Sequence, residues 1–146
     1  MISRAPTVIV DTSVALSCLL PAATSAAAEH LLLHDAWIAP ESAVLEACGV
    51  FAGLQRTGQL DHETALLAVH AFPRLYEEIV PVTPLVSLAL ALAVELSVTP
   101  EDAVYLALAE REGLPVVTGR QALAEAVRGT RFESMVLRLA EAHALA

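Results

Sequence analysis

Residues 7–16 read TVIVDTSVAL, and this stretch decides the fold of the chain. The run at residues 7–10 is short, largely β-branched and mostly apolar, which is typical of a strand buried on both faces of a parallel sheet. Asp11 follows directly, at the edge where open α/β sheets bind their ligands. Because an unpaired buried charge is costly, we expect a cation, a hydrogen-bond donor or water beside it. By itself Asp11 also suits the N-cap of the apolar helix that follows, and the two roles are compatible.

Strands and helices alternate along the rest of the chain, which predicts one α/β domain over residues 1–146 with a parallel sheet. Pro81 favours the end of a strand or the edge of the sheet. Thr-Pro pairs predict two helix starts, and Gly113 predicts a helix end. The expected strands are 7–10, 36–39, 79–82, 114–118 and 131–132. The expected helices are 13–20, 22–34, 41–56, 61–72, 83–96, 99–112, 121–127 and a terminal helix.

The composition predicts an aliphatic core and a soluble, cytoplasmic protein. Hydrophobic residues make up 56% of the chain and aromatic residues 4%, and this apolar excess favours a helical face buried against a second copy. No signal-peptide pattern precedes the first strand, and the longest apolar stretch, residues 85–94, is too short to span a bilayer. Cys18 and Cys48 have no CxxC spacing, so we expect buried free thiols in a reducing compartment.

The charge balance gives no long-range attraction for nucleic acid. Eight basic residues, all Arg, face seventeen acidic ones, for a formal charge of -9. A bound metal ion or a few local Arg residues can still hold a phosphate backbone. Ser13 lacks a nucleophile-elbow pattern, and no glycine-rich phosphate loop occurs, so serine hydrolysis and nucleotide binding of the Rossmann or P-loop type have no support.

Two further acids lie in settings similar to that of Asp11. Glu46 lies in the apolar helix expected at residues 41–56, either as a site carboxylate or at the edge of the buried stripe. Asp102 lies in the first turn of the helix after Thr99, where capping and the helix dipole alone explain an acid. If the three carboxylates converge, they need a hard cation, and Mg²⁺ or Mn²⁺ suits oxygen ligands. Such a site activates water for attack on a phosphodiester.

Four ordered segments resemble PIN-domain ribonucleases, in particular VapC-type toxins of toxin–antitoxin pairs. They are residues 8–13, the stretch from Pro40 to Glu46, residues 101–109 and residues 115–119. The resemblance covers essentially the whole chain. It implies a three-layer α/β/α sandwich with a central parallel sheet and Mg²⁺- or Mn²⁺-dependent cleavage of RNA. The partners it implies are an antitoxin and a second copy of the chain.

The resemblance also assigns roles to residues of this chain. The three catalytic and metal-binding acids fall on Asp11, Glu46 and Asp102, and the hydroxyls of Ser13 and Thr118 fall where they orient the carboxylates or water.

Two positions depart from the family pattern. A fourth acid is common just after residues 118–119, where this chain has Arg120, and an Asn common after the second acid is replaced by Gly49. Arg120 has three interpretations: it faces solvent, it contacts an RNA phosphate, or it folds onto Asp11 or Asp102 in place of the cation. Both the lost acid and the added cation predict weaker metal binding and reduced activity. The alternative to an enzyme is a catalytically inactive PIN fold that acts as a binding or regulatory module.

Overall fold

Strand β1 (Thr7–Val10) lies at the centre of a parallel sheet, in agreement with the burial of its last three residues. The structure is a computed structural model, and it describes residues 5–145. Within that range the sheet has five strands, all parallel, in the order β3-β2-β1-β4-β5. The other strands are β2 (Ala36–Pro40), β3 (Glu78–Val80), β4 (Val116–Thr118) and β5 (Val136–Arg138).

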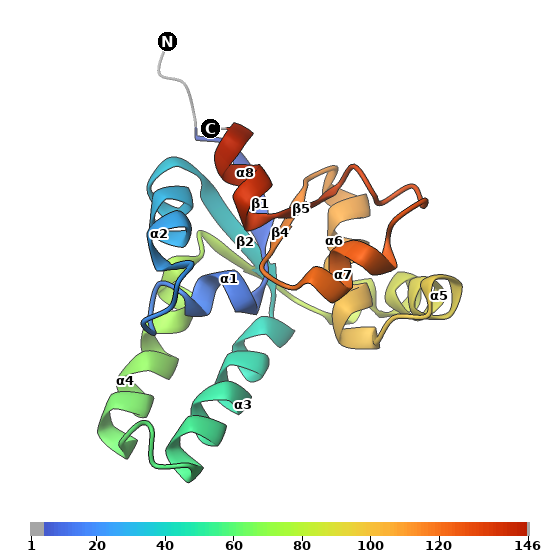
Figure 1. The fold of residues 1–146 in the computed structure, drawn as a ribbon. Coiled ribbons are helices and arrows are strands. Elements are labelled where there is room, and N and C mark those ends of the chain that lie inside the picture. The colour runs from blue at the N-terminus through green and yellow to red at the C-terminus, as the bar shows by residue number, and fades with distance from the viewer. Residues whose placement is uncertain (1–4, 146) are drawn as a thin grey trace.

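Helices cover both faces of the sheet, which confirms the expected α/β/α sandwich (Figure 1). On one face α6 contacts β1, β2 and β4, and α5 packs against α6. On the other face α8 contacts β4, β5 and α2. Figure 1 also shows α3 and α4 side by side, extending away from the sheet. The α-helices are α1 (Thr12–Leu16), α2 (Ser25–His34), α3 (Ser42–Arg56), α4 (His62–Ala71), α5 (Val86–Leu96), α6 (Pro100–Glu112), α7 (Gln121–Ala126) and α8 (Leu139–Leu145), with 3-10 helices η1 (Phe72–Leu75) and η2 (Thr83–Leu85).

The order of the strands places a ligand-binding crevice beside the end of β1. From β1 the chain passes to β2 on one side, and it later returns to β4 on the other side. Open α/β sheets bind ligands at this kind of reversal, outside the carboxyl ends of the two strands. Tyr76, which is buried, holds the end of β1 because its hydroxyl donates to the Val10 carbonyl at 2.9 Å. Asp11 therefore projects from a fixed strand end into the crevice.

Helix α6 begins and ends as the sequence predicts. The Thr99 hydroxyl accepts the Asp102 backbone N–H at 3.2 Å, and Pro100 follows at the first helical position. Gly113 ends the helix in the left-handed conformation, with φ 66°, which a side chain would disfavour. Residues 102–109 are all buried, so α6 is the central helix of its layer. Asp102 and Tyr105 are the polar groups that this burial brings to the sheet.

Several expected elements have other bounds in the structure. Residues 131–132 form part of a turn, because Phe132 packs into the core and its carbonyl accepts the Val136 N–H at 3.1 Å; the last strand is β5. The helix expected at 13–20 ends at Leu16, and the next begins at Ser25 after the turn around Pro21. Thr83 does not cap a helix but lies in η2. Pro81, as expected, follows the edge strand β3.

Neither cysteine is fully buried, which corrects the sequence-based expectation. Both thiols are free, but Cys18 is half-buried and Cys48 is exposed. The reason at Cys48 is that α3 extends beyond the sheet and buries only a narrow stripe, formed by Ala43, Ala47 and Phe51.

Helix α5 carries a row of exposed apolar side chains. Val86, Leu90 and Val94 are spaced four residues apart and are 49%, 66% and 76% exposed. Within residues 5–145, no helix is by itself long and apolar enough to cross a membrane; the segments Thr83–Leu96 and Pro100–Glu112 meet that test only as a pair, with a bend of 114° between them.

Candidate active site

Asp11 is buried at the end of β1 and is fully engaged by neighbouring donors. Its side chain caps α1 by accepting the Val14 N–H at 3.2 Å, and the same oxygen accepts from the Ser13 hydroxyl at 2.6 Å. The other oxygen accepts from the hydroxyl of Thr118, the last residue of β4. These contacts confirm the N-cap prediction. They also supply the donors that a buried carboxylate needs.

Ser13 and Gly119 meet at the same strand ends. The Ser13 hydroxyl accepts the Gly119 backbone N–H at 3.0 Å, across 106 positions of the chain. A Cβ at residue 119 would lie 3.2 Å from that hydroxyl oxygen, so glycine permits the close approach of the two segments. The carboxyl ends of β1 and β4 are thereby linked through side chains that contact Asp11.

Glu46 faces the same crevice from α3. Its Oε1 accepts from the Tyr105 hydroxyl at 3.3 Å, and that hydroxyl lies 3.2 Å from the Thr12 hydroxyl. Burial raises the pKa of Glu46, and the nearby charges of Asp11 and Asp102 add to that rise. The three acids thus act on one another electrostatically, although they come from three separate elements.

Asp102 forms an ion pair with Arg120. The two guanidinium nitrogens of Arg120 donate to the two oxygens of Asp102, one of them at 3.2 Å. The hydrogen bond to Asp102 raises the pKa of the guanidinium, so it stays charged. Of the three interpretations of Arg120, the structure therefore shows the one in which it folds onto a carboxylate.

A pocket of about 320 Å³ lies between these side chains. Asp11 and Glu46 both line it, whereas Asp102 adjoins it through Arg120. Its full lining is Asp11, Thr12, Ser13, Leu16, Glu46, Val50, Tyr105 and Arg120.

The acids suit a divalent ion in kind, but their present arrangement does not hold one. Mg²⁺ and Mn²⁺ prefer carboxylate oxygens; the carboxylates of Asp11 and Glu46 line the pocket, and that of Asp102 adjoins it through Arg120. Yet across residues 5–145 no three His, Cys, Asp or Glu side chains are grouped closely enough to bind an ion together. Both oxygens of Asp102 are paired with Arg120 instead.

Thr12 is a site residue to which the sequence analysis assigned no role, whereas Tyr105, expected from its place after Asp102 to be core or pocket wall, is buried and lines the pocket. Thr12 is buried, and its hydroxyl donates to the Ala43 carbonyl at 3.3 Å, which joins α1 to α3. Tyr105 joins Thr12 to Glu46. The spacing of Tyr105, one helical turn after Asp102, is the signal that places both on one face of α6.

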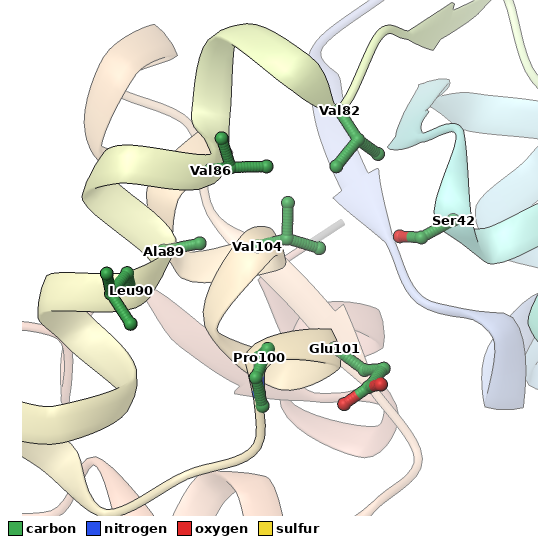
Figure 2. A pocket seen from close by; sticks show the side chains of 8 residues that line it. All are labelled: Ser42, Val82, Val86, Ala89, Leu90, Pro100, Glu101 and Val104. Atoms are coloured by element: carbon green, nitrogen blue, oxygen red, sulfur yellow. The ribbon is translucent and has the colours of Figure 1, made fainter.

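A second, apolar pocket of about 260 Å³ lies between α5 and the start of α6 (Figure 2). The aliphatic side chains of Val82, Val86, Leu90 and Val104 line it. In Figure 2 the Ser42 hydroxyl points toward this space from the start of α3, one turn before Glu46.

We expect Thr118→Val to lower the free energy of unfolding by about 1–3 kcal/mol, because it removes a hydroxyl that donates to a buried carboxylate at unchanged volume. Urea denaturation measures this loss. Thr57→Val is the matched control, since Thr57 is exposed and its hydroxyl bonds to the Leu54 carbonyl and to the exposed Gln59 side chain rather than to a buried charge; we expect a change within about 0.5 kcal/mol there. Equal effects at the two positions would contradict the role given to Thr118.

The metal-free protein is expected to gain stability as the pH falls from neutral. Burial raises the pKa of both Asp11 and Glu46, so the folded chain binds protons more tightly than the unfolded chain. This gain accrues as the pH falls through the raised values toward the ordinary carboxyl values of 3.8 and 4.5. Melting temperatures are measured in chelator across this pH range for the wild type and Asp11→Asn. The difference between the two profiles shows how much of the gain in stability comes from Asp11. Parallel pH profiles would contradict the expectation.

The comparisons with known proteins agree with this fold. The PIN domain model matches residues 8–127. Similar solved structures include PAE2754 from Pyrobaculum aerophilum (TM-score 0.71, 20% identity, 97% of this chain and 88% of that one). A toxin–antitoxin complex from Klebsiella pneumoniae gives a TM-score of 0.61 at 18% identity, over 90% and 97% of the two chains. VapC20 from Mycobacterium tuberculosis, described as a sarcin-ricin loop cleaving toxin, gives 0.61 at 20% identity, over 82% and 94%. A comparison with curated protein sequences gave no match.

Since the domain model spans most of the chain, from the centre of β1 to the end of α7, the chain belongs to the PIN domain family.

Proposed function

We propose that the chain is a metal-dependent RNA endonuclease of the VapC toxin type. The observation that carries the proposal is the approach of Asp11, Glu46 and Asp102 to one crevice at the ends of β1 and β4. Membership of the PIN family and the likeness in fold to VapC20 support it. The ion in this proposal is Mg²⁺ or Mn²⁺, held by the three acids.

When bound, the ion would lower the pKa of a water molecule and neutralise charge on the scissile phosphodiester. The chain's own residues prepare that chemistry. Ser13 and Thr118 fix the orientation of the Asp11 carboxylate, and Tyr105 fixes that of Glu46. The formal charge of -9 means that RNA must be held by local contacts, and we expect binding to weaken with added salt.

RNA cleavage in Mn²⁺ tests the proposal. We expect purified protein to cut single-stranded RNA in the presence of Mn²⁺ or Mg²⁺ and to stop when a chelator is added. Because Arg120 replaces the fourth acid, we expect slow cleavage. Cleavage that continues unchanged in chelator would contradict the proposal.

A second candidate function is a binding or regulatory module without catalysis. The ion pair between Arg120 and Asp102 favours it, because it uses both oxygens of one acid. The two candidates differ in metal binding: calorimetric Mn²⁺ binding that Asp11→Asn removes favours the enzyme, and its absence favours the module.

The proposed partners are a cognate antitoxin and a second copy of the chain. The likeness in fold to the Klebsiella pneumoniae toxin–antitoxin complex supports the first. The exposed row on α5 supports the second, because monomeric proteins rarely leave such a continuous apolar stripe in water.

We expect the wild type to have the mass of a dimer in light scattering at micromolar concentration, and Leu90→Glu to shift it toward the monomer. Leu90 is 66% exposed, so the charge does not disturb the core of one copy. Leu33→Glu is the control, because Leu33 is 81% exposed on α2. A monomeric wild type would contradict the homodimer.

A further inference from the structure

The Arg120 guanidinium lies beside the acidic side chains, where a positive charge is needed. Arg120 belongs to a different part of the chain from each of the three acids. It precedes α7, two residues after the end of β4, and its backbone N–H donates to the Thr118 hydroxyl at 2.9 Å. That hydroxyl in turn donates to Asp11. The backbone of Arg120 is therefore fixed to the acidic crevice, and its side chain turns back over the pocket to reach Asp102 at the start of α6.

The guanidinium neutralises charge that three carboxylates would otherwise share. Among the side chains that line the pocket, Arg120 supplies the positive charge, and Asp11 and Glu46 supply negative charge. All three acids raise the pKa of Arg120, with Asp102 contributing most. A divalent ion at these carboxylates would meet the same electrostatic need.

The ion pair between Arg120 and Asp102 is partly exposed to solvent, so it can break. The Asp102 side chain is 12% exposed, but that of Arg120 is 46% exposed, so water reaches the guanidinium from outside. Partly exposed ion pairs contribute little net stability, and their long basic side chains have other rotamers in solvent. Turning Arg120 outward would free both oxygens of Asp102 without unfolding any element.

We propose that Arg120 is an internal counter-ion that competes with the divalent metal for Asp102, so that metal binds only when the guanidinium leaves. This inference rests on the proposed function, because it assigns the same carboxylates to the metal. It goes beyond a missing fourth acid, which would weaken the metal site without competing for it. It also differs from a purely structural ion pair, whose loss would change stability but leave metal affinity alone.

Calorimetric titration with Mn²⁺ tests the competition directly. We expect Arg120→Ala to bind Mn²⁺ about tenfold more tightly than the wild type, since the ion no longer displaces a bidentate partner. Arg120→Gln should do the same, and it provides a second variant should the first fold poorly. Arg120→Lys keeps the charge but loses the bidentate geometry, so its Mn²⁺ affinity should lie between that of the wild type and that of Arg120→Ala.

Arg128→Ala is the matched control. It removes the same unit of charge from an exposed position eight residues further along, so a general electrostatic effect would appear there as well. We expect its Mn²⁺ affinity to equal that of the wild type. A second readout is the rise in melting temperature on adding Mn²⁺, which should be larger for Arg120→Ala than for Arg128→Ala.

The outcomes separate this inference from the proposed function. Equal Mn²⁺ affinity in the wild type, Arg120→Ala and Arg120→Gln would overturn the competition and leave the metal-dependent nuclease standing. Equal gains in Mn²⁺ affinity in Arg120→Ala and Arg128→Ala would also overturn the competition, because the change in net charge alone would then explain both gains. Mn²⁺ binding by none of the proteins would overturn both the competition and the metal site.

Discussion

Asp11→Asn is expected to reduce metal-dependent RNA cleavage at least about a hundredfold, the upper range of losses seen when only the supporting groups around a metal site are removed. Asp11 contacts more of the site than any other acid, since Ser13, Val14 and Thr118 all donate to it. Asparagine keeps the size of the side chain and one acceptor oxygen for capping α1. The substitution therefore removes mainly the charge. The cleavage rate of a labelled single-stranded RNA in Mn²⁺ measures the effect.

Asp61→Asn is a closely matched control for that experiment. Asp61 caps α4 as Asp11 caps α1, and its side chain accepts the Thr64 N–H at 2.7 Å. It is exposed and is not among the residues that line the acidic pocket. We expect this variant to cleave RNA like the wild type. If Asp11→Asn also retained wild-type activity while folding normally, the assignment of Asp11 to the catalytic site would be wrong.

Arg120→Asp is expected to raise metal-dependent cleavage about tenfold or more. The substitution removes the cation that pairs with Asp102 and places a carboxylate where the family commonly has its fourth acid, so both changes favour a divalent ion. Initial rates at limiting Mn²⁺ show the effect best, because saturating metal hides a difference in affinity. Arg120→Ala should give part of the gain. Unchanged rates in both variants would remove the argument that this position limits activity.

Much of the fold could be predicted from local patterns. The run at residues 7–10, the Asp11 and Thr99 caps and the Gly113 stop each depend on a few neighbouring residues, and the structure has all of them as expected. The prediction of a strand at residues 131–132 was wrong, because so short a stretch has the same composition in a turn as in a strand. In the structure Phe132 lies in a turn, and its side chain is buried in the core from there.

The site was predictable in part. The positions of Asp11, Glu46 and Asp102 at strand ends and helix faces indicated that they approach one another. The hydrogen bonds that organise them were not predictable, because Thr12 and Tyr105 meet across 93 positions and Tyr105 meets Glu46 across 59. The direction of Arg120 was also open, since a long side chain beside a crevice can reach solvent, a phosphate or a carboxylate.

The proposed nuclease depends on one divalent ion held jointly by Asp11, Glu46 and Asp102. Anomalous diffraction from crystals soaked in Mn²⁺ tests it most directly, because it locates the ion and the guanidinium together. We expect a single manganese peak bounded by these three carboxylates, with Arg120 turned away from Asp102. Crystals at saturating Mn²⁺ with no peak among the acids, and with Arg120 still paired to Asp102, would contradict it.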